Sequence, residues 1–328
     1  MLAATVLFRP QRTGAVRGGR VPYTCAMTPP EPPDGTVGHL AGRLQHWFER
    51  LWPDTDRCGR AIAALEAHRS DERAVSASAC DELVAVVTAF SKHFALDHDP
   101  AGRRAPDVEP PGWDPVPPEA VARRGGSVRS VERRPDGVAV IALDDLDPLP
   151  LALPYLEAAF GLAAGADGVV LDLSENGGGD PATVALVVSW VVGPRHVRIS
   201  DVHHRERTVQ WWTHRRPAEL SLPPATPAAV VVSERTFSSG EALAFHLQQL
   251  CGLPVVGAPS RGAADHITPV RVTADVTAFL PEAYVVDAAS GGSWEGRGVV
   301  PDVAVAGGGA REQAVRHVLE RPRRAPLS

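Results

Sequence analysis

A serine at the junction between an expected strand and an expected helix is the side chain best placed for covalent chemistry. The apolar run at residues 228–233 predicts a buried strand, and the segment T-F-S-S-G-E follows it over residues 236–241. A serine in such a turn is exposed, and backbone N–H groups lie near it at the helix start. Ser238 is therefore a candidate nucleophile, although a serine here can also simply cap the helix.

Three consecutive glycines are a second candidate for chemistry. They occupy residues 177–179, between a strand at 168–173 and a helix that Asp180 can cap and Pro181 can begin. Glycine lets the backbone turn sharply, and N–H groups beside a helix N-terminus attract an anion or a developing oxyanion. A plain tight turn is the alternative, and a phosphate loop is excluded because no G-K-[ST] follows.

A histidine and a carboxylate could activate the serine. His93 stands in the segment S-K-H-F at the end of a third expected helix, where a histidine commonly caps the C-terminus instead. Glu295 stands among glycines beside Trp294, where it could orient a histidine or be a solvated loop residue. Serine needs a base to remove its proton, histidine titrates near neutrality, and a carboxylate fixes the tautomer of the histidine.

Two kinds of structure must position these residues. Apolar side chains recur at helical spacing over residues 36–98, which predicts a small bundle of three helices, the third opening near Ser70. Residues 99–120 predict a proline-rich linker, because proline fixes φ and removes a donor. Residues 1–35 predict a disordered tail, because they are rich in Pro, Gly and Arg without periodicity.

Beyond the linker the period changes, and residues 121–320 predict an α/β core. Strands alternate with helices there, which argues for a largely buried sheet. The segments are a hairpin at 127–131 and 138–143, strands at 168–173, 228–233 and from 255, and helices at about 150–164, 181–192 and 239–250.

Taken together, four ordered stretches resemble the C-terminal processing (tail-specific) serine peptidases, in particular their tricorn-like and interphotoreceptor retinoid-binding-protein-like branch. Residues 171–179 resemble D-L-R-x-N-G-G-G, 195–213 a strand pair ending in Q-x-W-T, 236–241 T-F-S-A-A-E, and 293–303 N-W-E-G-x-G-V-x-P-D-V. The resemblance covers residues 125–305 and, more weakly, 36–98. It implies a crotonase-like ββα-type peptidase core with a small N-terminal helical domain. No segment between residues 100 and 125 is long enough for a PDZ domain.

The resemblance also implies roles for individual residues. Ser238 takes the place of the nucleophile, His93 that of the general base, and Glu295 that of the carboxylate that orients the histidine. Ser91 stands where the family often has Asp and is a weaker candidate for a helper. The expected enzyme is a serine-type peptidase, a hydrolase that acts on peptide or protein substrates.

The oxyanion hole is assigned in the same way. Its donors match the N–H of Ser239 and the N–H of either Gly178 or Gly179, and the sequence does not choose between the two glycines.

The lysine content separates two branches of the family. Many members use a serine–lysine dyad, with the lysine in a G-E-x-T-F-G-K turn after the nucleophile. That turn reads G-A-P-S-R-G-A over residues 257–263, so Ala263 stands where the lysine would be. Lys92 is the single lysine among 33 Lys and Arg residues, and it precedes the serine. The chain therefore fits the histidine-dependent branch.

Two departures from the family pattern support other readings. Ser174 replaces the arginine before E-N-G-G-G, and Ala258 replaces the glutamate of G-E-x-T. The retinoid-binding protein of the eye uses repeats of this fold as a ligand carrier. One alternative is thus a catalytically inactive member that binds an apolar ligand, and another is a different hydrolase, such as an esterase, built on the same turn.

Composition argues against several other classes. The formal net charge of −6 does not suit a nucleic-acid binder, and no apolar run reaches the ~18 residues of a membrane span. The four cysteines are scattered without a C-x-x-C pair, so we expect neither a disulfide framework nor a metal or other cofactor. The first residues lack the features of an export signal, which indicates a cytoplasmic location. The sequence does not decide whether the chain forms a homo-oligomer.

Overall fold

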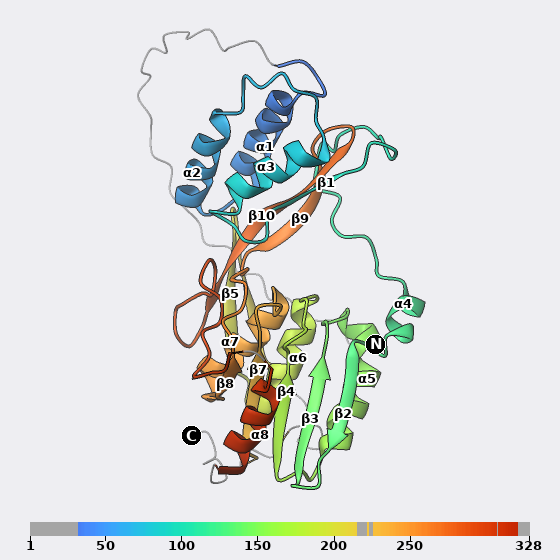
Figure 1. The fold of residues 1–328 in the computed structure, drawn as a ribbon, viewed down its shortest axis with the longest axis vertical. Helices are drawn as coiled ribbons and strands as arrows, with labels where there is room; N and C mark the ends of the chain where they lie inside the picture. Colours follow the sequence, from blue (N-terminus) through green and yellow to red (C-terminus); the bar gives the residue numbers. More distant parts are fainter. Residues whose placement is uncertain (1–31, 215–221, 223–225, 307, 321–328) are drawn as a thin grey trace. The chain divides into compact units, whose positions relative to one another are not determined.

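The computed structural model describes residues 32–214, 222, 226–306 and 308–320 (Figure 1). Most of the tail expected over residues 1–35 lies outside these ranges. Within them, no helix is both long enough and apolar enough to cross a membrane.

Three helices come first in the described chain, and a polar side chain caps the start of each. They are α1 (Val37–Leu51), α2 (Thr55–Glu66) and α3 (Ala77–Val87). The capping side chains accept a hydrogen bond from the backbone N–H three residues later, and they belong to Thr36, Asp54 and Ser76.

The third helix is shorter than the sequence predicts at both ends. It begins at Ala77 and not near Ser70, because Ser76 provides the cap. It ends at Val87, so His93 lies in a turn beyond the helix and does not cap it.

An antiparallel sheet packs against these helices (Figure 1). Its strands are ordered β1-β10-β5-β6, and β9 also pairs with β10. Their bounds are β1 (Ala95–His98), β5 (Arg198–His204), β6 (Thr208–Trp212), β9 (His266–Arg271) and β10 (Val276–Asp287). Leu44 and Leu83 of the helices share an apolar core with Val270 and Ala278 of the sheet. The turn that carries His93 is thus fixed between α3 and the edge strand β1.

The proline-rich segment runs beside the β9–β10 hairpin. Three of its N–H groups donate to carbonyls of residues 271, 274 and 275. The ring of Trp113 stacks on Phe279 of β10 at 5.7 Å between centroids. The short helix α4 (Pro118–Arg123) then leads into the second sheet. The domain boundaries drawn from the sequence at residues 98 and 120 stay predictions.

The second sheet has six strands in the order β11-β8-β7-β4-β3-β2. β2 is antiparallel to β3, and the other neighbours are parallel. The bounds are β2 (Val128–Arg133), β3 (Val138–Leu143), β4 (Gly168–Asp172), β7 (Ala228–Val232), β8 (Val255–Gly257) and β11 (Val303–Ala304). The predicted hairpin and the mixed α/β class are confirmed.

Helices cover both faces of this sheet, which explains its continuous apolar strands. Helices α5 (Leu149–Ala163), α6 (Pro181–Val192) and α7 (Ser239–Cys251) pack on one face, and α8 (Ala310–Glu320) packs on the other. Ile141 and Leu171 contribute to the first core, whereas Val140 and Val170, their neighbours along the strands, contribute to the second. Both the glycine turn and the serine turn follow the carboxyl ends of adjacent parallel strands, β4 and β7.

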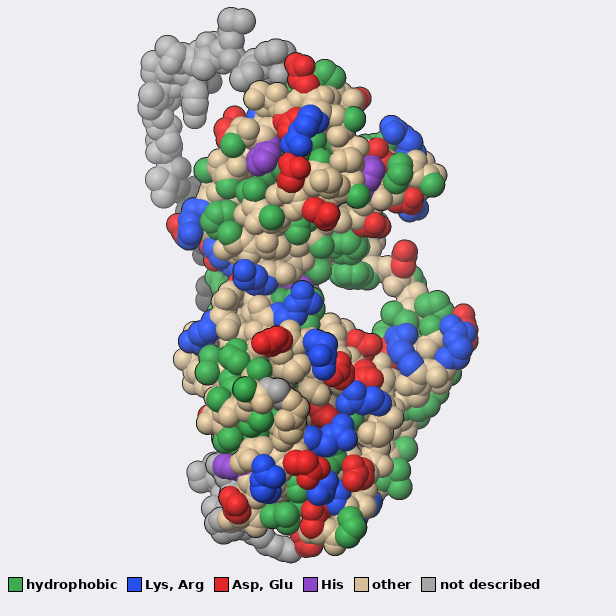
Figure 2. Space-filling model, viewed as in Figure 1, with side chains coloured by type: hydrophobic (Ala, Val, Ile, Leu, Met, Phe, Trp, Pro, Cys, Tyr) green, Lys and Arg blue, Asp and Glu red, His purple; other side chains and the backbone are tan. Residues whose placement is uncertain are grey.

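Arginines are interspersed with carboxylates on the surface. Figure 2 shows blue and red side chains mixed over the lower half of the face drawn. Arg134 pairs with Glu312 at 2.8 Å, and Arg129 pairs with Asp144 at 3.3 Å. These arginines therefore form local ion pairs, which contribute little to stability where solvent screens them.

Candidate active site

Ser238 lies between β7 and α7 in a backbone conformation that few side chains adopt. Its φ is 54° and its ψ −122°, and within the described ranges Ser127 is the one other non-glycine residue with positive φ. Such strain costs about 1–3 kcal/mol and persists where the surroundings enforce it. Here the N–H of Ser238 donates to Glu241 at 2.8 Å, and the N–H of Phe237 donates to the Asn176 carbonyl at 2.9 Å.

Glu241 fastens this turn to a neighbouring loop. Its side chain is fully buried and also accepts from the N–H groups of Gly262 at 2.6 Å and Ala263 at 2.9 Å, and from the Ser260 hydroxyl at 2.6 Å. Burial raises the pKa of Glu241, while its hydrogen bonds act in the opposite direction. The carboxylate thus holds both the serine and residues 260–263 in place.

The glycine turn packs directly against the serine. Gly178 has φ +107°, and a Cβ built on it would lie 2.7 Å from the Cβ of Ser238. A side chain at this position would push the serine away, so the close approach requires glycine.

Two N–H groups at this junction have no hydrogen-bond partner among the described residues. They belong to Gly179 and Ser239. The hydroxyl of Ser239 donates to the Gly179 carbonyl at 2.7 Å, which ties the two turns together. The N–H of Gly178, in contrast, donates to the Asn176 side chain at 3.0 Å.

A pocket opens beside Ser238 and Ser239. Its walls are mostly apolar, and they come from α6, α7, β5, β6, β10 and residues 263–266 and 294. A concave, mostly apolar lining with a few polar groups suits a small ligand or one side chain of a larger one. Within the described ranges, no group of three His, Cys, Asp or Glu side chains is placed to hold a metal ion.

His93 lies next to the serine turn but makes no hydrogen bond to Ser238 in the described structure. Its ring meets that of Phe237 edge-on at 4.7 Å between centroids. Its Nδ1 is buried without a hydrogen-bond partner among the described residues. Burial lowers the pKa of His93 to about 4, so the imidazole is neutral at physiological pH.

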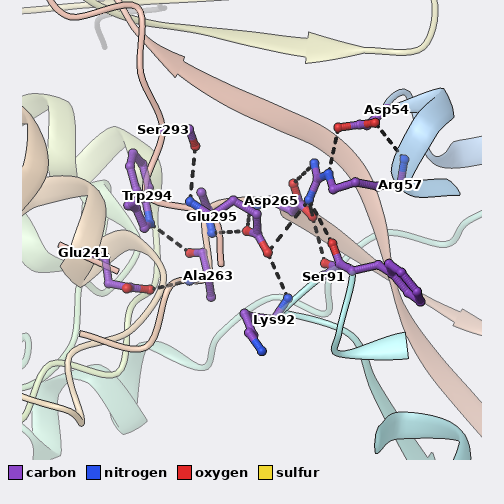
Figure 3. A network of polar contacts seen from close by, with 12 residues as sticks. Asp54, Arg57, Ser91, Lys92, Glu241, Ala263, Asp265, Ser293, Trp294 and Glu295 are labelled. Atoms are coloured by element: carbon purple, nitrogen blue, oxygen red, sulfur yellow. Dashed lines mark hydrogen bonds and ion pairs between the residues drawn. The ribbon is translucent and has the colours of Figure 1, made fainter. Parts of the chain in front are cut away.

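Glu295 contacts the backbone beside His93 and not the His93 ring (Figure 3). One carboxylate oxygen accepts from the N–H of Lys92 at 2.9 Å. The other accepts from the N–H groups of Ala264 at 2.6 Å and Asp265 at 3.1 Å. Burial, and then the nearby Asp265 carboxylate, raise the pKa of Glu295 to about 7. The expected contact of this glutamate with the histidine is therefore replaced by a contact with the histidine's own turn.

Ser91 belongs to the same network but faces a different partner. Its hydroxyl donates to Asp265 at 2.8 Å, and Arg57 of α2 binds both oxygens of Asp265 at 2.8 Å (Figure 3). Asp54 binds the same guanidinium at 2.7 Å. A two-point arginine–carboxylate contact is strong and directional, so it locks α2 and the His93 turn to the loop at 265.

Comparison with known proteins assigns this fold. The model of peptidase family S41 matches residues 152–305. The chain is accordingly a serine-type peptidase, a hydrolase. The comparisons do not single out the retinoid-binding-protein-like branch, which stays a prediction.

Solved structures agree with the S41 fold over most of the chain. A candidate peptidase from Parabacteroides merdae has a TM-score of 0.60 at 11% identity, covering 87% of this chain and 98% of that one. A lipoprotein from Streptococcus agalactiae has a TM-score of 0.53 at 15% identity, covering 88% and 97%. The photosystem II D1 C-terminal processing protease has a TM-score of 0.51 at 14% identity, covering 87% and 97%. At these identities the likeness shows the fold alone.

Several residues of this S41 site escape sequence reasoning. The anchoring role of Glu241 has one local signal, a glutamate three residues after a candidate N-cap. Arg57 and Asp265 have none, because 208 positions separate them. The same holds for His246 and Asp287, whose side chains meet at 2.8 Å beside the pocket.

Proposed function

We propose that the chain cleaves peptide bonds with Ser238 as the nucleophile. The observation that carries this proposal is the strained turn that presents Ser238 to a pocket, with two unpartnered N–H groups beside it. A serine in this position attacks the carbonyl carbon of a bound peptide, and the amine departs after it has taken up a proton.

The oxyanion hole consists of the N–H groups of Gly179 and Ser239. Both are free to donate, and the bond between the Ser239 hydroxyl and the Gly179 carbonyl holds them close. Donors fixed before reaction stabilise the developing negative charge without reorganisation. Gly178 has a different task, because its own N–H is used by Asn176 and its missing side chain makes room for Ser238.

His93 acts as the general base. Its low pKa keeps it neutral, which is the form that can accept a proton, and its Nδ1 has no competing partner in the described structure. Catalytic hydrogen bonds are commonly long or absent without substrate and form in the complex. The hydrogen bond from Ser238 to His93 forms at that stage, when bound peptide orders the pocket.

Glu295 and Ser91 position this base without touching it. Glu295 binds the N–H of Lys92, and Ser91 binds Asp265, so the two residues that precede His93 are fixed. A hydrogen bond between His93 and the backbone of Asp265 raises the pKa of His93 against the larger effect of burial. This bond offsets part of the cost of the imidazolium that forms when the serine loses its proton.

The test is digestion of a mixed peptide library by the wild type, Ser238→Ala and Ser78→Ala, read by mass spectrometry. Ser78 is an exposed serine of α3 and serves as the matched control. Cleavage by the wild type and Ser78→Ala, but not by folded Ser238→Ala, is the expected result. Cleavage that persists in Ser238→Ala would overturn the assignment. Folded proteins that all fail to cleave would favour the apolar-ligand carrier instead.

A further inference from the structure

A histidine–aspartate pair forms the polar end of the pocket beside Ser238. The Nδ1 of His246 lies 2.8 Å from an oxygen of Asp287, and both side chains are buried. The other oxygen of Asp287 accepts from the N–H groups of Ala289 and Ser290 and from the Ser290 hydroxyl, at 3.1, 2.7 and 2.8 Å. Burial raises the pKa of Asp287, but His246 and these donors outweigh it and lower the pKa.

The pair is placed at a definite depth from the nucleophile. Ser239, Ala242 and His246 follow one face of α7 and all line the pocket. His246 lies seven positions after Ser239, the first residue of α7, which is a rise of about 10 Å along the helix. The distance between the two side chains is shorter, because helical side chains lean toward the N-terminus. A side chain that enters beside Ser238 and runs along α7 therefore meets His246 near its tip.

The walls between these two points are apolar and partly aromatic. They include Val184 of α6, Ile199 of β5, Trp211 of β6, Val285 of β10 and Trp294. The ring of Trp294 also meets that of His246 edge-on at 5.7 Å between centroids, which fixes the imidazole plane. Ser200, Asp265 and His266 also line the pocket, and His246 is the polar side chain that lies farthest along α7 from Ser238. A mostly apolar channel with few polar groups selects for an amphipathic side chain.

The chemistry of the pair specifies the polar group. Asp287 holds the Nδ1 side of the ring and does not line the pocket, so Nε2 is the nitrogen available to a ligand. A carboxylate only accepts, so the Nδ1–H of His246 donates to Asp287, and a ligand hydroxyl can hydrogen-bond to Nε2. A carboxylate would meet the negative charge of Asp287. A lysine would lose its hydration in the apolar channel without a free carboxylate to bind. Donors already occupy both oxygens of Asp287, and Arg57 and Ser91 already occupy those of Asp265, the carboxylate that lines the pocket.

We propose that this pocket binds the side chain on the acyl side of the scissile bond and selects tyrosine there, through a hydrogen bond from the phenol to His246. The inference rests on the proposed peptidase function of Ser238 and adds its substrate class. The aromatic ring fills the apolar channel, and the hydroxyl reaches the imidazole.

The experiment measures kcat/KM for peptides that differ at this one position, which carries tyrosine, O-methyltyrosine, phenylalanine, leucine, lysine or glutamate. For the wild type we expect tyrosine to exceed phenylalanine about fivefold, the effect of one neutral hydrogen bond. O-methyltyrosine, which has no proton to donate, should fall to the phenylalanine level or below. This comparison needs no variant.

Two variants then locate the preference. In His246→Leu the ratio of the tyrosine rate to the phenylalanine rate should fall to about one. His203→Leu is the matched control, because His203 stacks on Tyr284 outside the pocket and its loss should leave the preference intact. Thermal unfolding verifies that both variants are folded.

The outcomes separate this proposal from the one on which it rests. Cleavage with equal rates for tyrosine and phenylalanine, a preference for lysine or glutamate, or a tyrosine preference that survives in His246→Leu would overturn the pocket assignment while the peptidase stands. Absence of cleavage of all six peptides and of the mixed library would overturn both.

Discussion

Two buried glutamates hold the two halves of the proposed active site, and they differ in how they are surrounded. Glu241 binds the N–H groups of Gly262 and Ala263 together with that of Ser238. Glu295 binds the N–H groups of the next two loop residues, 264 and 265, together with that of Lys92. A single loop, residues 260–265, thereby joins the nucleophile to the turn of the general base.

The neighbours of the two carboxylates are not equivalent. Glu241 has a hydroxyl as its fourth donor, from Ser260. Glu295 has the carboxylate of Asp265 nearby and a more distant Arg57, 3.8 Å away, that already serves Asp265. Burial raises the pKa of both glutamates; four donors oppose the rise at Glu241, whereas Asp265 adds to it at Glu295. The nucleophile therefore has an anchor bound by four donors, and the base has an anchor that titrates near neutral pH.

The largest expected loss of stability follows from the removal of Glu241. Glu241→Ala removes one acceptor from three N–H groups and a hydroxyl inside the protein, so we expect the free energy of unfolding to fall by about 4 kcal/mol. Urea unfolding measures the change. Glu234→Ala, at an exposed position of the same turn, should change it by less than about 0.5 kcal/mol. A loss below about 1 kcal/mol in Glu241→Ala would show that the serine turn does not depend on this carboxylate.

The contrast between the anchors also shows what the sequence could reveal. Ser238 and the glycine turn were identifiable because each lies in a short segment between a recognisable strand and helix. The α/β class followed from alternating apolar strands and helices. His93 and Glu295 were found by resemblance, but their partners were not, because the contacts that join α2 and the His93 turn to Asp265 and Glu295 span 174 to 208 positions. Pairings over such distances depend on how α2, the His93 turn and the loop at 265 pack, and no local pattern records that.

The titration of Glu295 makes the free energy of unfolding depend on pH, and this is the expected effect of intermediate size. The folded pKa of Glu295, about 7, lies above its ordinary value of 4.5, so the folded state holds this proton more tightly. Its contribution to stability is present below pH 4.5 and is lost as pH rises to about 7, a change of about 3 kcal/mol at most. Unfolding free energies of the wild type minus those of Glu295→Gln should therefore fall over this window. A flat difference would contradict the assignment.

His93 and His266 change the free energy of unfolding with pH in the opposite direction to Glu295. The effect of Glu295 must therefore be measured as the difference between the wild type and Glu295→Gln. The pKa values of His93 and His266 fall from 6.5 to about 4 on burial. Their contribution is present above pH 6.5 and is lost as pH falls toward 4, so stability rises with pH where the Glu295 contribution falls. In Glu295→Gln, which has no Glu295 carboxylate to titrate, the free energy of unfolding should rise with pH because of these histidines. Glu234→Gln, whose carboxylate is exposed, should keep the wild-type profile.

The smallest expected effect on stability tests whether the serine turn works through its shape. Gly178→Ala places a Cβ 2.7 Å from that of Ser238, at a φ of +107°, and should lower the free energy of unfolding by about 1–2 kcal/mol. Peptide cleavage should fall at least tenfold, because the serine must move away from Gly179 and Ser239. Gly161→Ala is the matched control, since its Cβ would meet no atom within 4 Å in α5.

That control should retain full cleavage and gain up to about 1 kcal/mol, because alanine favours a helix over glycine. If Gly178→Ala kept wild-type cleavage, the close approach of the glycine turn to Ser238 would have no catalytic value, and Gly179 could not be the oxyanion donor it brings into reach. If it lost cleavage with little loss of stability, the geometry of the turn would be separable from the anchoring by Glu241. The nucleophile half of the site would then depend on two independent features, its anchor and its shape.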